Sequence, residues 1–445
     1  MRFKLKSFID NVSLPFVIVG VIFTYGGSAF AETSLPVPRI DTGDTTWVLI
    51  SAAMVMLMTP GLALFYGGMV RRKNVLGTMM QSFIAIPVIS IQWVLIGYSL
   101  AFGPDIGHFI GSLSWAGLSG VGLMPNADYA PTIPHQAFMI FQMMFAVITP
   151  AVISGGFAER IKFSSYLVFL LLWSTLVYDP IAHWAWGAGG WIKNMGGLDF
   201  AGGFVVEINS GVAALAAVLV VGRRKGWPHE PIMPHNLTLM LVGAGLLWFG
   251  WFGFNAGSAV ASGSVATAAF VATHIATAAA ALGWTVAEWK HRGKPTLLGA
   301  ASGAVAGLVA ITPAAGFVSP LPSLLIGGVA GVLCYCAVVG KSRLGYDDTL
   351  DAFGVHGVGG TWGALATGLF ASTAVNAAGA NGLFYGNPGL LLIQLTGVAA
   401  TWAYSFGMTF LIMKGISATM GLRIAKDEEE QGLDLTQHGE SGYSM

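Results

Sequence analysis

The chain has 445 residues, of which 55% are hydrophobic and only 9% are charged. Soluble domains carry about 25% charged residues, so this composition excludes an ordinary soluble enzyme and a disordered chain. The 21 basic and 21 acidic side chains balance, which also excludes a protein that binds nucleic acid through excess positive charge. The 61 glycines lie within apolar runs, as in membrane helices that pack closely. The composition therefore predicts an all-α polytopic membrane protein.

Residues 1–31 have the features of a secretory signal peptide. A basic start precedes an apolar stretch at residues 12–23, and Ala29-Phe30-Ala31 provides a small-x-small cleavage pattern. An uncleaved first span is the alternative, but the apolar stretch is short for a span. We predict cleavage after about Ala31, which leaves the mature amino terminus outside the cytoplasm.

Eleven apolar segments follow a short external segment at residues 32–46, and each is long enough to cross a hydrocarbon core of about 30 Å. They are predicted near residues 47–69, 77–102, 135–158, 164–186, 200–222, 237–256, 264–289, 296–312, 321–340, 353–370 and 389–414. The first five fall within residues 47–222, the next five within 237–370, and the eleventh helix within 389–418. Residues 419–445 form an acidic cytoplasmic tail.

Basic residues indicate the orientation, because cytoplasmic loops of membrane proteins are rich in Lys and Arg. Sixteen basic residues lie on one side of the predicted spans, whereas only Arg39 and Lys193 lie on the other side of the mature chain. This asymmetry predicts a multi-pass protein of the cell (inner or plasma) membrane, with its amino terminus outside and its carboxyl terminus inside. An odd number of spans is consistent with that arrangement.

Two short motifs recur at positions five spans apart. Ile148-Thr149-Pro150-Ala151 in span three returns at residues 311–314, and the residues from Phe204 through Glu207 to Gly211 return from Phe353 through His356 to Gly360. Because five is odd, the second copy enters the membrane from the opposite face. The sequence thus predicts a 5+5 inverted repeat plus one extra helix, with the substrate path between the copies near the bilayer midplane.

Ionisable residues at bilayer depth cost about 2.5–3.5 kcal/mol each, so each of them needs a reason. Glu207 and His356 occupy equivalent positions in the two repeats, and a pseudo-two-fold axis would bring them together. A carboxylate and an imidazole in contact could accept and return a proton. The alternative is a hydrogen-bonded pair that only joins two helices.

Three other polar residues receive structural interpretations. Asp179 precedes Pro180 and is expected to cap a helix end, and His183 is expected at the membrane interface. His274 lies within span seven and is expected to make a helix–helix hydrogen bond. Aromatic residues at Trp186, Phe141 and Phe145, and around Trp251 either anchor the interface or attract a small cation, and the pattern leaves both open.

Four stretches resemble the signatures of a known family, the Amt/Mep/Rh ammonium transporters. They are Trp251-Phe252-Gly253-Phe254-Asn255-Ala256-Gly257-Ser258, Asp199-Phe200-Ala201-Gly202-Gly203, Gly354-Val355-His356-Gly357-Val358 and Gly155-Gly156-Phe157-Ala158-Glu159-Arg160. The resemblance covers essentially the whole mature chain. The Asp199 and Trp251 stretches are similar to the Amt branch rather than to the Rh branch.

The resemblance implies eleven helices around a narrow apolar pore, one pore per subunit of a homotrimer, and no metal or cofactor. By motif, it implies a substrate-binding site of Phe145, Trp186, Ser258 and Asp199, a pore gate of Phe145 and Phe254, and pore-adjacent residues Trp251, Thr312 and Phe141. It also implies that the tail is a docking segment for a trimeric PII-type signal protein.

One departure from the family pattern concerns the pore. The family usually carries two histidines there, and His356 occupies the second position. The first position is Glu207, as in some fungal-type members. The expected relay is therefore a carboxylate–imidazole pair.

The predicted function is ammonium transport rather than enzyme catalysis. Moving a bare ammonium ion into an apolar bore costs up to tens of kcal/mol, whereas removing its proton at pH 7 costs roughly 3 kcal/mol. We expect NH4+ to bind at the outer site, lose a proton, and cross as NH3, with the proton following through Glu207 and His356. The alternatives are an electroneutral NH3 channel, an ammonium sensor of the same fold, and an intramembrane enzyme. No nucleophile or metal motif in the sequence favours the enzyme.

Overall fold

The computed structural model describes residues 39–443, so the predicted signal peptide at residues 1–31 lies outside the described residues. The first half contains α1 (Thr42–Met69), η1 (Arg72–Asn74), α2 (Val75–Phe83), α3 (Ala85–Gln92), η2 (Trp93–Gly97), α4 (Tyr98–Phe102), α5 (His135–Phe157), α6 (Phe163–Trp173), η4 (Ser174–Tyr178), α7 (Asp179–Trp186), α8 (Trp191–Asn194), η5 (Gly203–Ile208) and α9 (Asn209–Val221). Helix α1 therefore begins at Thr42, within the predicted external segment.

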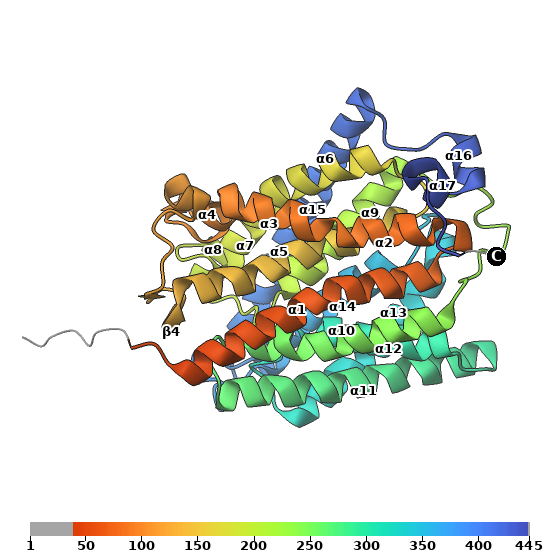
Figure 1. The fold of residues 1–445 in the computed structure, drawn as a ribbon. Helices are drawn as coiled ribbons and strands as arrows, with labels where there is room; N and C mark the ends of the chain where they lie inside the picture. The colour runs from red at the N-terminus through yellow and green to blue at the C-terminus, as the bar shows by residue number, and fades with distance from the viewer. Residues whose placement is uncertain (1–38, 444–445) are drawn as a thin grey trace, which may run out of the picture. The chain divides into compact units, whose positions relative to one another are not determined.

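The second half continues with a further set of helices and ends in two short ones. It contains α10 (Leu237–Gly257), α11 (Ser264–Arg292), α12 (Leu297–Ile311), α13 (Pro320–Leu344), η6 (Phe353–Gly357), α14 (Val358–Phe370), η7 (Leu383–Tyr385), α15 (Pro388–Thr419), α16 (Lys426–Gln431) and α17 (Leu433–His438). Figure 1 shows that the long helices run alongside one another.

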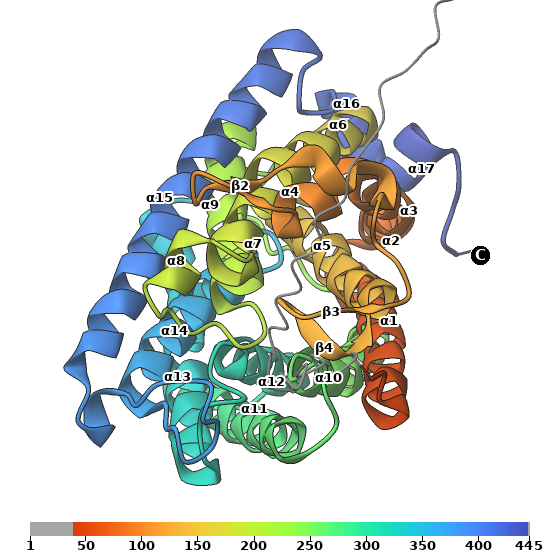
Figure 2. The ribbon, with the colours of Figure 1, turned by 90° about the vertical axis from the view of Figure 1, so that its left-hand side faces the viewer.

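Among the described residues, strands are confined to the long connection between α4 and α5. In that connection β1 (Asp105–Ile106) pairs with β2 (Ile110–Gly111), and β3 (Pro125–Asn126) pairs with β4 (Ala130–Pro134), both antiparallel. The short η3 (Leu113–Leu118) lies between the two pairs. Figure 2 shows this connection at one end of the helices, where β2 lies near α4 and α7.

Among residues 39–443, nine helical stretches are long and apolar enough to cross a membrane. Helix α12, with 15 residues, is apolar but shorter, and η6 with α14 forms one further stretch over Phe353–Phe370. The structure thus confirms an all-α membrane architecture, and every predicted span range contains a helix. The number of helices that cross the bilayer stays a prediction.

Close backbone contact joins the first helices of the two predicted repeats, α1 and α10. A Cβ added at Gly68 would lie 2.5 Å from the Met240 nitrogen, and one at Gly243 would lie 2.3 Å from the Phe65 nitrogen. Only glycine permits this approach, which is how membrane helices gain packing energy without a hydrophobic driving force between them. The predicted repeats are therefore joined by direct helix contact.

Helix α15 extends the contact between the two halves. It packs against α9 of the first half and α14 of the second, and also against α6. Figure 2 shows it running beside both halves. Gly397 of α15 faces the Phe204 ring, since a Cβ there would lie 2.8 Å from Phe204 Cζ. The eleventh predicted helix thus supports the segment that carries Glu207.

Candidate functional site

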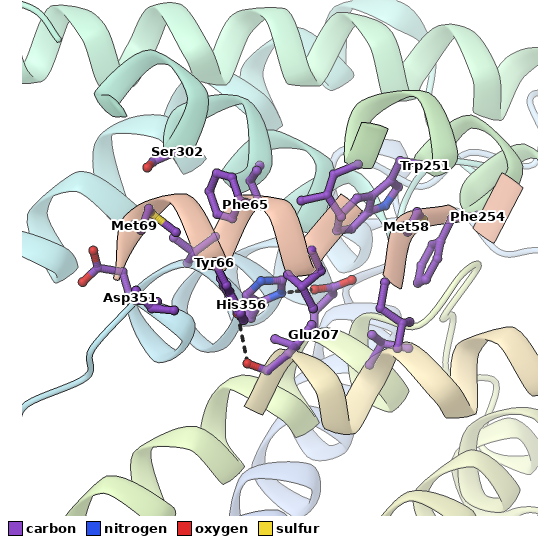
Figure 3. A pocket seen from close by; sticks show the side chains of 18 residues that line it. Met58, Phe65, Tyr66, Met69, Glu207, Trp251, Phe254, Ser302, Asp351 and His356 are labelled. Atoms are coloured by element: carbon purple, nitrogen blue, oxygen red, sulfur yellow. Dashed lines mark hydrogen bonds and ion pairs between the residues drawn. The ribbon is translucent and has the colours of Figure 1, made fainter. Parts of the chain in front are cut away.

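Glu207 and His356 meet in the interior of the protein. Glu207 lies on η5 and His356 on η6, and 2.7 Å separates Glu207 Oε2 from His356 Nδ1. Both residues are buried. The contact predicted from the repeat is confirmed, because one partner comes from each half of the chain. Figure 3 shows the pair in the middle of a cavity.

The two segments that carry this pair have matching local geometry. Both η5 and η6 are π-helical turns, a form that often marks functional sites. A residue in the left-handed region lies just before each of them, namely Gly202 with φ 119° and Asp351 with φ 62°. These two residues stand five positions before Glu207 and His356, so the repeat extends to backbone conformation.

Carboxylates hold the start of each segment. Asp199 accepts backbone hydrogen bonds from Gly202, Gly203, Phe204 and Val205. Asp348 accepts them from Ala352 at 3.1 Å and Phe353 at 2.8 Å. Sequence reasoning missed Asp348, although it precedes His356 by the same eight positions that separate Asp199 from Glu207. Extending the repeat match towards the amino terminus would have found it.

Two glycines of the repeat allow these segments to cross closely. A Cβ at Gly360 would lie 2.7 Å from Glu207 Cβ, and one at Gly211 would lie 2.0 Å from the Gly357 nitrogen. Each glycine therefore packs on the partner repeat. The glycine that ends each repeated motif therefore leaves room for the other motif, where a larger side chain would clash.

A narrow cavity of about 30 Å³ surrounds the pair. Such a volume accommodates roughly two water-sized molecules. Its lining is mostly apolar, and its few polar side chains include Glu207, His356 and Asp351. Figure 3 shows Phe254 and Trp251 at one end and Asp351 at the other, with the pair between them.

Two aromatic rings close one end of this cavity. Phe145 and Phe254 have centroids 4.3 Å apart with an interplanar angle of 37°, and both are buried. Phe254 lines the narrow cavity, while Phe145 also contacts the Trp186 ring at 5.8 Å on the other side. The predicted contact between the two phenyl rings is confirmed. We call this contact the ring pair.

A second, open pocket lies beyond the ring pair and is lined by Trp186, Ser258 and Asp199. Trp186 Nε1 donates to the Asp199 backbone oxygen at 2.9 Å, which fixes the indole. Ser258 Oγ donates to the Phe254 backbone oxygen at 2.8 Å, so its lone pairs are left to accept a hydrogen bond. The Asp199 carboxylate accepts hydrogen bonds from the backbone N–H groups of residues 202–205, which fixes the backbone beside the pocket.

The pore-adjacent residues differ in position. Trp251 lines the narrow cavity, and its Nε1 donates to Thr312 Oγ1 at 2.9 Å. Thr312 in turn donates to the Leu308 backbone oxygen at 2.8 Å. Phe141 is buried behind Phe145, with ring centroids 5.0 Å apart. Thr312 and Phe141 line neither pocket and support the residues that do.

Two interpretations of polar residues, those of Asp179 and His274, were wrong. Asp179 lies inside the continuous helical stretch from Phe163 and is buried, where it accepts a hydrogen bond from Gln92 Nε2 at 2.9 Å. His183 is buried in the protein and lies against Asp105, and its place at the membrane interface stays a prediction. His274 is exposed on α11 beside the Trp248 ring, and no hydrogen bond to it is seen among the described residues. Local sequence could not decide these contacts, because each partner lies on a distant segment.

A buried charge network at the Asp351 end of the cavity was also missed. Glu159, with φ 72°, pairs with Arg71 at 2.9 Å and Arg224 at 3.3 Å, and Arg224 pairs with Asp347 at 2.7 Å. Burial raises the pKa of the Glu159 carboxyl, but Arg224 and Arg71 outweigh it and hold the pKa below its ordinary value. The stretch from Gly155 to Arg160 was the sequence signal for this network.

The acidic tail packs on this same end through α16 and α17. Asp434 Oδ1 accepts from the Gly77 nitrogen at 2.8 Å, and the Leu433 nitrogen donates to Asn74 Oδ1 at 2.9 Å. Arg423 and Glu429 form an ion pair at 2.7 Å. The tail is therefore a docked segment in the described part of the chain.

Comparisons with known proteins agree with this arrangement. The model of the Ammonium Transporter Family matches residues 46–443. An ammonium transporter of Bacillus subtilis is 56% identical over 90% of this chain and 98% of its own length, and ammonium transporter Amt1 of Archaeoglobus fulgidus is 48% identical over 90% and 99%. The structure of Mep2 from Saccharomyces cerevisiae matches with a TM-score of 0.83 and 37% identity, over 87% of this chain and 89% of that one. The chain belongs to the ammonium transporter family, whose members are transporters and not enzymes.

Proposed function

We propose that this protein takes up ammonium by binding NH4+ beside Trp186, removing a proton after the ring pair, and conducting NH3 through the narrow cavity. The observation that carries the proposal is the Glu207–His356 hydrogen bond inside a mostly apolar cavity. An acid and an imidazole in contact at that depth offer a path for the released proton. The proposed transport is therefore electrogenic, with net entry of NH4+.

The open pocket has the chemistry to recruit a small cation. Ring faces of Trp186 and Phe145 attract a cation by about 0.5–2 kcal/mol per good contact. The Ser258 hydroxyl donates to a backbone oxygen and can accept a hydrogen bond from an ammonium N–H. Potassium carries the same charge but has no N–H to donate, so the Ser258 hydroxyl favours the binding of ammonium over that of potassium.

The mostly apolar lining of the narrow cavity favours passage of uncharged NH3 over NH4+. A bare ion in an apolar bore lacks its hydration shell, which costs up to tens of kcal/mol, whereas deprotonation at pH 7 costs roughly 3 kcal/mol. With the proton removed, NH3 passes apolar walls and accepts or donates hydrogen bonds at Glu207 and His356. Deprotonation is the route of lower free energy.

The main alternative is an electroneutral NH3 channel, in which Glu207 and His356 only join two helices. Replacing Glu207 with Gln separates the two, because the amide keeps the shape and hydrogen bond but exchanges no proton. We expect the ammonium-evoked current of Glu207→Gln in proteoliposomes to fall by at least about tenfold. Glu288→Gln is a matched control, since Glu288 is a buried carboxylate that bonds Thr296 and does not line the cavity.

An undiminished current in Glu207→Gln, with the Glu288→Gln control also active, would remove the relay role from the proposal. A sensor of the same fold is a further alternative, because the structure of a Sensor Amt Protein is similar to this chain, with a TM-score of 0.82 and 28% identity. Ammonium accumulation in liposomes that contain only the purified chain separates a transporter from a protein that only senses.

We further propose a homotrimer in the cell membrane, with eleven spans, a cleaved signal peptide and the tail in the cytoplasm. The Phe252 ring stacks on the exposed Phe270 ring, with centroids 3.9 Å apart, and both lie beside the exposed His274 on α10 and α11. An imidazole facing lipid is costly, so a neighbouring subunit is the favoured cover for this face. The docked tail offers a surface for a PII-type signal protein. Native mass spectrometry of the purified protein, alone and with a PII protein, tests the trimer and this partner.

A further inference from the structure

The β1–β2 hairpin closes over the end of α7 that carries Trp186. Trp184 Nε1 donates to the Phe109 backbone oxygen at 2.9 Å, which pins the hairpin to this helix. Figure 2 shows β2 near α4 and α7, both of which it contacts. The hairpin is therefore placed to influence the open pocket, although it does not line it.

His183 makes two hydrogen bonds that together fix its charge. Its Nδ1 lies 3.0 Å from the Ala101 backbone oxygen, and its Nε2 lies 2.8 Å from Asp105 Oδ1. A carbonyl and a carboxylate both accept hydrogen bonds, and a neutral imidazole has only one N–H to donate. The geometry thus calls for an imidazolium with Asp105 as its counter-ion. A buried cation is tolerated when it is paired in this way.

Asp105 is ionised at neutral pH. Partial burial raises the pKa of its carboxyl, but hydrogen bonds from His183 and His108 outweigh this and leave the pKa below its ordinary value. The other titratable groups near the carboxylate are His108 on the same hairpin and Tyr129, with Asp128 and Lys193 beyond Tyr129. The ionised Asp105 carboxylate can therefore only accept a hydrogen bond, and the donor between the two groups must be an N–H of His183.

The second oxygen of Asp105 connects the hairpin to the loop after Trp186. Asp105 Oδ2 accepts from the His108 nitrogen at 3.1 Å, and His108 Nδ1 donates to the Gly189 backbone oxygen at 2.7 Å. Gly189 has φ 96°, and a Cβ there would lie 2.6 Å from Asp105 Cβ. We call Asp105, His108, His183 and Gly189 the hairpin clasp.

The hairpin clasp holds both sides of Trp186. His183 stands one helical turn before it, and Gly189 lies three residues after it. The Trp186 backbone oxygen also accepts from Lys193 Nζ at 3.0 Å. Opening of the clasp would release the loop after Trp186, and with it the indole that covers Phe145.

We propose that Asp105 and His183 form a charged clasp that positions Trp186 over the ring pair and thereby sets the affinity for ammonium. Both are positioning residues, since neither touches the substrate path. The proposal rests on the proposed recruitment of ammonium at Trp186. The clasp depends on the hydrogen bond between Asp105 and His183, so removing the carboxylate should free the loop after Trp186 and lower the affinity for ammonium.

Ammonium-evoked currents in proteoliposomes test this over a concentration series at one fixed external pH. Asp105→Ala removes the counter-ion and should raise KM about tenfold, the scale of one charge-assisted hydrogen bond, with the saturating current within about twofold. Asp105→Asn donates an amide N–H to the lone pair of a neutral His183. It should keep KM near the natural value. Ser114→Ala, an exposed hydroxyl in the same connection, is the control.

Hydrogen–deuterium exchange of residues 103–112 and 187–197 provides a readout that does not depend on transport. We expect faster exchange in Asp105→Ala than in the natural protein or Asp105→Asn. An unchanged KM and exchange in Asp105→Ala would overturn the clasp, and so would an Asp105→Asn variant whose KM rises as much as that of Asp105→Ala. Loss of clasp protection in a protein that shows no ammonium current would instead contradict the proposed function and leave the clasp standing.

Discussion

Gly360 provides a direct test of how tightly the two repeats must cross. A Cβ added there would lie 2.7 Å from Glu207 Cβ and 2.9 Å from the Ile208 nitrogen. Ordinary contacts between such atoms begin at about 3.5 Å, so Gly360→Ala must push η5 away from α14, the helix that continues η6. Overpacking of this kind costs about 1–3 kcal/mol. Because the Glu207–His356 bond is 2.7 Å long and hydrogen bonds weaken beyond about 3.2 Å, a shift of about half an ångström breaks it.

We therefore expect Gly360→Ala to lower the melting temperature and to reduce the ammonium-evoked current at every substrate concentration. Gly245→Ala is the matched control, since its Cβ would meet nothing within 4 Å. That change should stabilise the protein by about 0.5–1 kcal/mol through helix propensity alone. A Gly360→Ala protein with the natural melting temperature and current would show that the close crossing of the two repeats is not needed for the Glu207–His356 hydrogen bond.

Three further predictions follow from the site and the charge network. Ser258→Ala should raise the KM for ammonium about tenfold with little change in saturating current, measured by concentration series, because one charge-assisted hydrogen bond is lost; an unchanged KM would remove Ser258 from the recruitment site. Thr312→Val leaves Trp251 Nε1 without its buried acceptor and should cost about 1–3 kcal/mol in thermal unfolding, whereas an additional Trp251→Phe change should recover part of that loss. The pKa values of Glu159 and Asp347 are lowered in the folded protein by their arginine partners, which outweigh burial, so the unfolded chain binds more protons. Their stabilisation is present above the ordinary values of 4.5 and 3.8 and is lost as pH falls through the lower folded values, which melting curves between pH 7 and pH 3 should show as a decline that Asp347→Asn flattens.

The sequence could predict that the two repeats pair, because equivalent residues have the same spacing in both segments. The match between the Glu207 and His356 motifs predicted a contact that the structure confirms at 2.7 Å. The same spacing contained Asp348, whose role is evident only when its carboxylate is seen on the Ala352 and Phe353 nitrogens. A pattern locates equivalent positions, but the partner of a side chain depends on what the fold brings beside it.

Single polar residues show the limit of sequence reasoning most clearly. Asp179 was expected to cap a helix and instead bonds Gln92, which lies 87 positions away. His183 is buried against Asp105, a partner 78 positions away that the sequence did not identify. Helix packing creates these pairs, and no local signal specifies them.

The sequence by itself determined the membrane class, the approximate helix ranges and the family, because hydropathy, glycine content and motif order are properties of the linear chain. The tertiary structure decided which side chains share a cavity, that the Asp199 carboxylate is held by backbone N–H groups, and that His183 contacts both the Ala101 carbonyl and the Asp105 carboxylate. These are matters of distance and direction between atoms on separate helices. They are fixed only when the helices close on one another, since a hydrogen bond a few tenths of an ångström too long is already weak.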